Sequence, residues 1–489
     1  MSIRPNFAVS KSLSDFDPII FDQDCLVSGV CINAQQVKKG DLFIAFAGAK
    51  THGAKFIDQA VKNGAVAVLS DKKLDAQIPS FITPDPRKLI GPITAWLYSH
   101  PFEQLVAAGV TGTNGKTTTA NLVKQIWQLS GVQSALIGTL GVQIGGENLP
   151  TARTTPEADE LQALAATTLE KGCTNLVMEV SSHAIDQSRV KGCKYKVVAF
   201  TNLTQDHLDY HKTMDSYFAA KANLFTAEYA SAAVINIDDP YGAKLASESD
   251  IAVTTVSRRD SKADYYLKRS EVSKNGYFVE IVSKKGEVIT GDFGLLGDFN
   301  LENLLLAVAI AHLTGVSTSQ ITSVLSKLNS VPGRLEKIDA GQSFTALVDY
   351  AHSPDAVERV LKTARSFTGG KIIGVLGCGG DRDSSKRALM GKALFNGCDQ
   401  AIFTSDNPRS ESADQILSQM IDGLVLGSKG FVFPDRKQAI DQAVKLAKDG
   451  DTVLVLGKGH ESGQDFKGLV TPFDDRIELA ESIKRGMKS

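Results

Sequence analysis

The sequence predicts an α/β protein built from three domains. Its 489 residues are enough for about three domains of ~150 residues each. Apolar, strand-like runs alternate with helical patterns over most of the chain, as in parallel α/β sheets. A glycine-rich loop at residues 111–117 joins one such strand to one such helix. Hydrophobic residues make up 43% and charged residues 22% of the chain, which is typical of globular proteins.

Charge, cysteine content and hydropathy exclude several classes of protein. The net charge of −2 gives no basic field that would attract nucleic acid or an anionic membrane. Six scattered cysteines without CxxC spacing indicate reduced thiols rather than a disulfide framework or a zinc site. No signal-peptide core is visible, and no window approaches the ~18 apolar residues of a membrane helix. We therefore expect a cytoplasmic protein that binds neither nucleic acid nor membranes.

Residues 1–104 form the first predicted domain, an α/β unit. Strand-like runs occur at residues 41–46 and 65–69. The Ser-His-Pro break at residues 99–101 then precedes the strand of the glycine loop. This break sets the first domain boundary.

Residues 105–334 form the second predicted domain. Four apolar runs are typical of buried parallel strands, at residues 105–110, 175–180, 197–200 and 233–237. Residues 264–293 differ, because short alternating runs around Asn275-Gly276 and Lys285-Gly286 predict an antiparallel hairpin insert. A helix is expected over residues 301–313.

Residues 335–489 form the third predicted domain. Three apolar strands end in polar clusters, at residues 377–382, 405–409 and 457–461. Since ligands in open α/β sheets bind outside the carboxyl ends of strands, these clusters indicate a second substrate site. The first cluster is not a dinucleotide fingerprint, because Arg382 occupies the place of the last glycine.

The loop at residues 111–117 has the features of a phosphate site. Backbone N–H groups at a helix N-terminus favour an anion, and Lys116 adds a positive charge. Thr117 offers a hydroxyl to a magnesium ion bound to the phosphates. Val110 stands where the general P-loop pattern has its first glycine, so a plain glycine turn is the alternative. The flanking strand and helix favour nucleotide binding.

Two other strands of the second domain end in possible magnesium ligands. Glu179 could face the phosphate pocket, or it could simply cap the following loop. His207 and His211 have the i, i+4 spacing of zinc ligands, but Leu208 replaces the glutamate of the metalloprotease motif. One of these histidines is therefore a candidate magnesium ligand, with a satisfied polar histidine as the alternative. On spacing alone, Lys221 is typical of a solvated surface lysine.

Seven motifs occur in the order found in the Mur ligases. They are TGTNGKTTT, EVSSHAIDQSRV, FTNLTQDHLDYH, KANLF, GDFNLENLLLA, PGRLE and DYAHSPDA. The chain resembles this family of ATP-dependent, amide-forming enzymes of peptidoglycan synthesis over nearly its whole length. The resemblance implies an N-terminal UDP-binding α/β domain, a central P-loop ATPase with a parallel sheet, and a C-terminal Rossmann-like domain that receives an amino acid.

The resemblance also implies roles for single residues. Lys116, Glu179, His207 and Lys221 would be catalytic. Glu179 and His207 would bind magnesium with Thr117, and Lys221 would carry a carbamate, formed from carbon dioxide, as a further ligand. ATP would contact Thr111, Gly112, Thr113, Asn114, Gly115, Lys116, Thr117, Asn303, Arg334 and Asp349. The UDP-substrate would contact Thr154, Thr155, Ser181, Gln187 and Arg189.

The cluster SDNPRSE at residues 405–411 is similar to that of family members that add meso-2,6-diaminopimelate. Diaminopimelate differs from lysine by a second carboxylate, which an arginine can bind in bidentate fashion. Arg409 is the predicted partner, with a surface arginine as the alternative. Further predicted contacts to this amino acid are Arg387, Asp406, Asn407, Pro408, Gly457 and Glu461.

The resemblance therefore implies three substrates, namely ATP with Mg²⁺, a UDP-N-acetylmuramoyl dipeptide and diaminopimelate, bound by a monomer. Three alternatives stay open. The chain could be another ligase of the superfamily that adds L-lysine, D-alanyl-D-alanine or glutamate to folate. It could also be a P-loop kinase or a nucleotide-gated binding module without turnover.

One segment departs from the family pattern. Asn33-Ala34-Gln35 stands where the family has Asp-Ser-Arg, a few residues before Gly40-Asp41-Leu42-Phe43. The family's serine contact to uracil is therefore not expected at Ala34. His211 is the first candidate for the base that receives the proton of the incoming amine.

Overall fold

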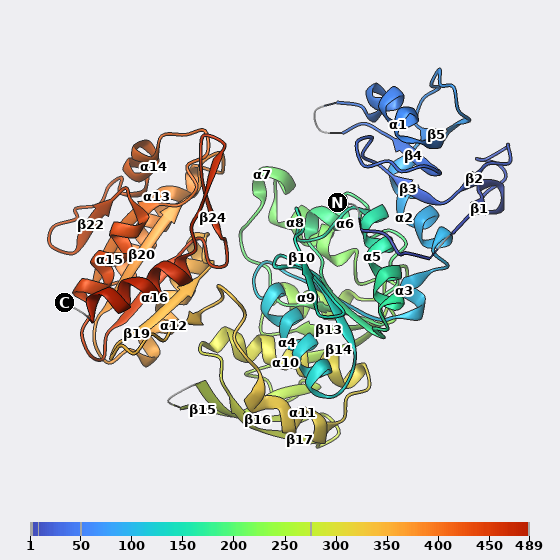
Figure 1. Cartoon of the computed structure of the whole chain (residues 1–489). Coiled ribbons are helices and arrows are strands. Elements are labelled where there is room, and N and C mark those ends of the chain that lie inside the picture. The colour runs from blue at the N-terminus through green and yellow to red at the C-terminus, as the bar shows by residue number, and fades with distance from the viewer. Residues whose placement is uncertain (1–2, 8, 49–50, 274–275, 488–489) are drawn as a thin grey trace.

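The computed structural model describes residues 3–7, 9–48, 51–273 and 276–487 (Figure 1). Three sheets follow one another along the chain, over residues 29–82, 106–293 and 336–456, and each is covered by helices. The predicted α/β class with three domains is confirmed. The boundaries near residues 104 and 334 fall between the sheets and stay predictions. Among the described residues, no helix is both long and apolar enough to cross a membrane.

The N-terminal domain has a four-stranded parallel sheet in the order β3-β4-β5-β6. Helix α2 packs on this sheet through Ile90 and Ile93, and it also contacts α5 of the middle domain. It thereby joins the two domains. The elements are β1 (Lys11–Ser12), β2 (Leu26–Val27), β3 (Gly29–Cys31), β4 (Asp41–Ala45), α1 (Ile57–Asn63), β5 (Ala65–Ser70), β6 (Ser80–Ile82) and α2 (Pro86–Leu97).

The middle domain contains an eleven-stranded sheet in the order β10-β9-β8-β11-β7-β12-β13-β14-β15-β16-β17. Its centre, from β8 to β14, is parallel, and the four runs predicted as parallel strands are β7, β11, β12 and β13. The strands are β7 (Val106–Thr111), β8 (Ser134–Gly138), β9 (Gly141–Ile144), β10 (Glu147–Leu149), β11 (Asn175–Glu179), β12 (Val197–Phe200), β13 (Ala232–Asn236) and β14 (Ala252–Ser257).

The predicted hairpin insert forms the last three strands of this same sheet. Strands β15 (Tyr265–Ser273), β16 (Gly276–Ser283) and β17 (Val288–Phe293) are antiparallel to one another, and β15 joins β14 in parallel. The second predicted turn is present at Gly286, which has a φ of +81°. Asn275, in the first predicted turn, lies outside the described residues.

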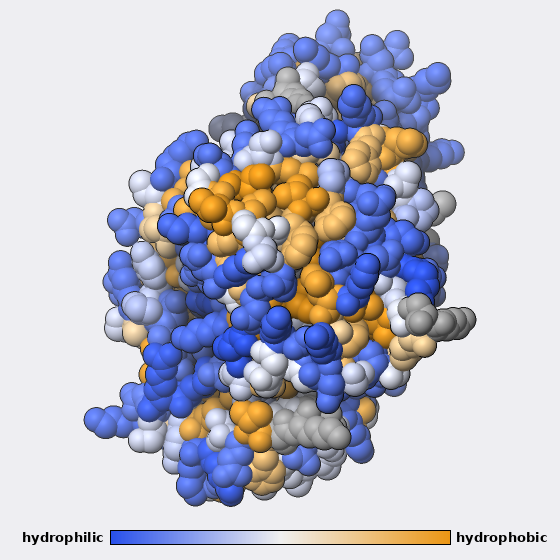
Figure 2. Space-filling model, turned by 90° about the vertical axis from the view of Figure 1, so that its left-hand side faces the viewer, coloured by the Kyte–Doolittle hydropathy of each residue, from blue (hydrophilic) through white to orange (hydrophobic). Residues whose placement is uncertain are grey.

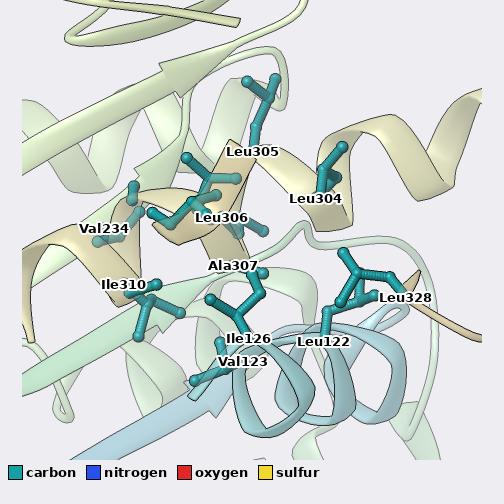
Figure 3. Packing of buried hydrophobic residues seen from close by; sticks show 14 of the residues in the cluster. Leu122, Val123, Ile126, Val234, Leu304, Leu305, Leu306, Ala307, Ile310 and Leu328 are labelled. Carbon is teal, nitrogen blue, oxygen red and sulfur yellow. The ribbon is translucent and has the colours of Figure 1, made fainter. Parts of the chain in front are cut away.

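Helices cover both faces of the middle sheet. Helix α10 lies beside α4 on one face of the sheet and is buried almost throughout its length, so apolar residues occur on all its sides (Figure 3). This packing fixes the start of α4, where the glycine loop ends. The helices are α3 (Pro101–Gln104), α4 (Lys116–Leu129), α5 (Ala158–Glu170), α6 (Ser182–Asp186), α7 (Leu208–His211), α8 (Met214–Ala222), α9 (Pro240–Glu248), α10 (Asp298–Leu313) and α11 (Thr318–Val324).

The C-terminal domain has a six-stranded sheet in the order β18-β19-β23-β20-β21-β22, parallel except for β18. The elements are β18 (Glu336–Lys337), β19 (Thr345–Asp349), α12 (Pro354–Phe367), β20 (Ile372–Cys378), α13 (Ser385–Gly397), β21 (Gln400–Ser405), α14 (Ala413–Met420), β22 (Gly430–Phe433), α15 (Arg436–Leu446), β23 (Thr452–Leu456) and α16 (Asp475–Gly486). The separate hairpin of β24 (Gly463–Phe466) and β25 (Leu469–Pro472) follows β23.

The C-terminal domain exposes several large apolar side chains. They are Leu389, Val425, Val432 and Ile477. Figure 2 shows apolar surface among hydrophilic surface on the side of the molecule where this domain lies. Apolar atoms make up much of any protein surface, so exposed side chains of this kind do not by themselves indicate a partner.

Candidate active site

The glycine loop connects β7 to α4 in the conformation that its sequence requires. Gly112 and Gly115 have φ angles of +143° and +89°, which side chains with a Cβ rarely adopt. Lys116, the first residue of α4, folds back so that its Nζ donates to the carbonyl oxygens of Gly112 and Thr113, both at 2.8 Å. Burial lowers the pKa of this lysine. The loop therefore combines a helix N-terminus with a cation that an anion could draw away from the carbonyls.

Glu179 faces this loop because β11 lies beside β7 in parallel register. Its carboxylate is buried, with Oε2 accepting from the Thr117 hydroxyl at 2.8 Å and Oε1 from the Thr139 amide at 2.8 Å. The following helix is capped by Ser181 instead. Glu179 and Thr117 are thus neighbours at the base of the loop, although 62 residues separate them in sequence.

Lys221 is buried and not a surface lysine, so the expectation from spacing alone is wrong. Only 1% of its surface is exposed, and its Nζ donates to the carbonyl oxygen of Gly112 at 2.8 Å. Burial and the nearby Lys116 hold its pKa well below the usual value. Its amine is therefore readily deprotonated beside the glycine loop.

The two candidate histidines have different surroundings. His207 precedes α7 with a φ of +54°, and burial lowers its pKa to about 4. A neutral imidazole can bind a metal ion. His211 is buried, with its Nε2 at 2.9 Å from the Ser182 hydroxyl, and it lines neither of the cavities described below. The geometry therefore does not support His211 as the base for an incoming amine.

A cavity of about 430 Å³, called here the loop cavity, lies between the middle and C-terminal domains. Residues 113–118 line it together with Asn303, Arg334 and Asp349, so the structure brings the three distant predicted residues to the loop. Arg334 Nη2 lies 3.4 Å from the Thr117 hydroxyl. Thr111 and Gly112 do not line the cavity, and Thr111 is fully buried.

Two contacts hold these distant residues in place. Asn303 Oδ1 accepts from the Thr119 hydroxyl at 3.2 Å and lies directly against Gly115, where a Cβ would collide with it. Asp349 accepts from the amide of Ala351 at 2.8 Å, and burial raises its pKa. Both side chains therefore face the loop from fixed positions.

A second cleft of about 500 Å³ lies between the same two domains. Its C-terminal wall includes Asn407, Arg409 and Glu461, three of the predicted amino-acid contacts, and its other wall includes residues 139–141. Arg409 has a φ of +52°, is half-buried, and donates from Nη1 to the carbonyl oxygen of Gly380 at 2.6 Å. The β24 strand holds its backbone through an Arg409 N to Asp465 O bond of 3.0 Å.

Four of the predicted amino-acid contacts lie outside the lining of this cleft. Asp406 is buried, which raises its pKa, and Gly457 passes close to it with a φ of +111°. The carbonyl of Pro408 abuts Gly380. These three residues shape the loops beneath the cleft.

Arg387, the fourth predicted contact outside the cleft, already forms an ion pair within the protein. It is 2% exposed and forms two 2.8 Å bonds to the Glu411 carboxylate. The geometry therefore does not support its predicted contact to a substrate carboxylate. Arg382, the last residue of the polar cluster at 377–382, is exposed and lines the loop cavity.

The predicted UDP-substrate residues form two groups. Thr155 and Ser181 lie at the end of β11, where the Thr155 hydroxyl donates to the Glu179 carbonyl at 2.9 Å, and Thr154 lines the loop cavity. Arg189 donates to Gln187 Oε1 at 2.6 Å. It also pairs with Glu157 at 3.1 Å.

The second group, Gln187 and Arg189, is linked to the N-terminal domain through Arg87. Arg87 of α2 bonds to the same Glu157 at 3.1 Å and to the carbonyl of Gln187 at 2.7 Å. No motif in the sequence singled out Arg87. In the segment that differs from the family pattern, residues 33–35, Ala34 is buried and Asn33 Oδ1 accepts from the Gln35 amide at 3.1 Å.

The donor set around the loop fits magnesium. A hydroxyl, a carboxylate and a neutral imidazole from Thr117, Glu179 and His207 all line the loop cavity. In the described part of the chain, no group of three His, Cys, Asp or Glu side chains could hold a metal ion by itself. Magnesium is usually bound by one or two carboxylates together with substrate phosphates, so this sparse set is suited to a nucleotide-bound ion.

Comparison with known proteins gives three family matches. The Mur ligase family catalytic domain matches residues 26–92, the Mur ligase middle domain residues 110–311, and the Mur ligase glutamate ligase domain residues 333–459. A UDP-N-acetylmuramoyl-L-alanyl-D-glutamate–2,6-diaminopimelate ligase of Streptomyces coelicolor is 43% identical over 95% of this chain and 94% of its own length.

Two solved structures extend the comparison to the fold. A structure of UDP-N-acetylmuramoyl-L-alanyl-D-glutamate–2,6-diaminopimelate ligase is 32% identical, with a TM-score of 0.70 over 97% of this chain and 99% of that one. MurF ligase from Thermotoga maritima, in complex with ADP, is 19% identical, with a TM-score of 0.65 over 94% of this chain and 98% of that one.

Proposed function

The chain belongs to the Mur ligase family, and within that family we propose that it adds meso-2,6-diaminopimelate to UDP-N-acetylmuramoyl-L-alanyl-D-glutamate. The reaction uses ATP, forms an amide, and releases ADP and phosphate. Its product is a peptidoglycan precursor. Nearly full-length similarity to ligases of this name supports the choice of amino acid as well as the type of reaction.

The meeting of the two cavities at Thr139 carries this proposal. Thr139 lines both the loop cavity and the second cleft. A carboxyl group bound beside it is open to the γ-phosphoryl group of ATP from one side and to an amine from the other. An amide ligase needs both approaches, whereas a P-loop kinase needs only the first.

Activation of the carboxylate takes place in the loop cavity. An oxygen of the substrate's D-glutamate γ-carboxylate attacks the γ-phosphorus of ATP, which forms an acyl phosphate and breaks the bond to ADP. The ammonium group of Lys116 leaves the carbonyls of Gly112 and Thr113 and contacts the transferring phosphoryl group, whose charge it stabilises. Thr117, Glu179 and His207 would hold magnesium, which would supply further positive charge there.

Amide formation takes place from the second cleft. The amine adds to the acyl carbon, and the C–O bond to phosphate then breaks as the tetrahedral intermediate collapses. The attacking nitrogen gives up a proton, which the departing phosphate can accept. His460 lines this cleft, and burial lowers its pKa to about 4, so its neutral ring is available to accept a hydrogen bond from the amine.

We also propose that Lys221 carries a carbamate. Its readily deprotonated amine adds to carbon dioxide and loses a proton, so the side chain gains an anionic oxygen ligand for magnesium. The negative charge of the carbamate offsets the positive charge of the neighbouring Lys116. Asn303, Arg334 and Asp349 keep their predicted role in ATP binding, because all three line the loop cavity opposite the glycine loop.

The UDP group is proposed to bind between the N-terminal and middle domains, near Gln187 and Arg189. Arg87 is added to the predicted residues because it meets them at Glu157. We place the reaction in the cytoplasm, since all six cysteines are free thiols, as expected in a reducing compartment. A single chain forms both cavities, which supports a monomeric enzyme.

A phosphate-release assay tests the function. ATP, Mg²⁺ and the UDP-dipeptide are supplied with either diaminopimelate or L-lysine as acceptor. We expect release that requires all substrates, with kcat/KM at least about 100-fold higher for diaminopimelate. ATP binding without any release would identify a binding module. A preference for lysine, D-alanyl-D-alanine or a folate would identify another ligase of the superfamily.

Arg409→Ala is expected to reduce the preference for diaminopimelate. Arg409 lines the second cleft, and only one of its guanidinium nitrogens is bonded to Gly380. Loss of one charge-assisted bond to the distal carboxylate costs ~1.5–3 kcal/mol, about ten- to a hundredfold in kcat/KM. We expect that decrease for diaminopimelate and less than about a threefold change for lysine.

The exposed Arg259 of the middle domain provides the matched control. Arg259→Ala should leave both values of kcat/KM unchanged. If Arg409→Ala keeps the wild-type ratio of the two acceptors, then other residues set the choice of amino acid.

A further inference from the structure

We infer that Lys458 is a positioning residue of the amino-acid site, whose buried ammonium group orients Asn407 and Glu461 toward the incoming amino acid. This inference rests on the proposed function and names the residue that organises that same cleft. Lys458 itself is fully buried and does not line the cleft. It therefore acts through its neighbours.

The ammonium group uses all of its donors on groups of the cleft wall. A lysine has three N–H donors and no acceptor, and leaving a buried one unpaired is costly. Nζ lies 2.7 Å from the Gly463 carbonyl, 3.2 Å from Asn407 Oδ1 and 3.3 Å from Glu461 Oε2. Asp406 Oδ1, at 3.5 Å, adds a second negative charge. The lysine thus links three segments of the chain.

Lys458 is one of three groups that fix which way the Asn407 amide faces. Asn407 Oδ1 accepts from Lys458 and from the Asp465 amide at 3.0 Å, and Nδ2 donates to Glu461 Oε2 at 2.7 Å. A flipped amide would place N–H groups against two donors and leave the carboxylate facing an oxygen. The lysine therefore stabilises a single amide orientation at the cleft.

The same contacts leave one oxygen of Glu461 for a ligand. Oε2 is shared by Lys458 and Asn407, whereas Oε1 has no hydrogen-bond partner within the part of the chain that the structure describes. Glu461 lines the cleft, with 34% of its side chain exposed. A carboxylate oxygen in this position accepts a charge-assisted bond from a substrate ammonium group.

The sheet beneath is fixed independently of Lys458. Arg436 donates to the last carbonyls of β21 and β23, Ser405 at 3.2 Å and Leu456 at 3.0 Å. It also pairs with Asp475, and both side chains are fully buried. Since this pair joins the two strand ends, loss of the Lys458 ammonium should disturb the side chains of the cleft more than the sheet.

The test is Lys458→Met in the full-length enzyme, with phosphate release measured against each substrate. We expect KM for diaminopimelate to rise about ten- to a hundredfold, while KM for ATP and for the UDP-dipeptide stays within about threefold. A merely structural role would lower kcat or the folded fraction and leave KM for diaminopimelate unchanged. Lys467→Met, on the exposed turn of the β24–β25 hairpin, is the control and should match the wild type.

Two further measurements keep the inference open to refutation. If Lys458→Met does not fold, KM for diaminopimelate in Lys458→Gln decides, and a wild-type value overturns the inference. Lys458→Met and Glu461→Gln should be clearly non-additive in KM, because both act through one contact. Additive effects would also overturn it. Wild-type enzyme that releases no phosphate with diaminopimelate would refute the proposed function itself, separately from either variant.

Discussion

Lys116→Ala is expected to lower the turnover of ATP at least about a thousandfold. The Lys116 side chain begins α4 and donates only to the carbonyls of Gly112 and Thr113, which it can leave for a phosphate. Arg334 also lines this cavity, but its guanidinium lies over the Tyr350 ring at 4.6 Å and next to Thr117. Arg334 therefore does not replace a lysine that moves onto the phosphoryl group.

The measurement is single-turnover formation of ADP with the UDP-dipeptide present. Lys124→Ala, farther along the same helix, is the matched control and should retain activity. Binding of the UDP-dipeptide by calorimetry should change less than about twofold, because Lys116 is not among its predicted contacts. A folded Lys116→Ala protein with substantial turnover would refute phosphate binding at this loop.

The strands that carry the loop and Glu179 could be predicted because of where they lie. Strands β7, β11 and β12 are neighbours in a parallel sheet and buried on both faces, so each is a continuous apolar run. Parallel register then places the carboxyl ends of these strands together. Glu179 next to Thr117 follows from this arrangement alone.

Contacts between distant segments could not be derived from local patterns. Asn303 reaches Gly115 only because α10 packs on α4, and Asp349 faces the loop only across the domain junction. Their assignment came from the family resemblance. Spacing in sequence gives the face of a helix on which a residue lies, but not what covers that face.

Two lysines and two arginines illustrate this limit. Lys221 looks like a surface residue in sequence, and no pattern predicts the burial of Lys458, yet both are almost fully buried. Arg387 is occupied by Glu411, 24 residues away, whereas Arg382 faces the loop cavity. Burial and pairing depend on tertiary structure, and they distinguish residues of one type that a motif treats alike.

Lys221→Ala is expected to lower turnover about a hundred- to a thousandfold and to be partly restored by short carboxylates. Addition of carbon dioxide requires a neutral amine. Because the pKa of Lys221 is well below the usual value, a larger share of this lysine is neutral at a given pH than of an exposed one. Acetate or formate would place an anionic oxygen in the space that the shorter side chain leaves open.

The carbamate and a merely structural lysine predict different results. With a carbamate, the intact mass of native wild-type protein in bicarbonate exceeds the sequence mass by one carbon dioxide, and Lys221→Ala lacks the increase. Removal of bicarbonate should lower wild-type activity, and Lys262→Ala, at an exposed position, should behave as the wild type. A structural ammonium group would be restored by amines rather than carboxylates. Unmodified Lys221 in bicarbonate, with no recovery by carboxylates, would exclude the carbamate, because no anionic oxygen would then be required beside Gly112.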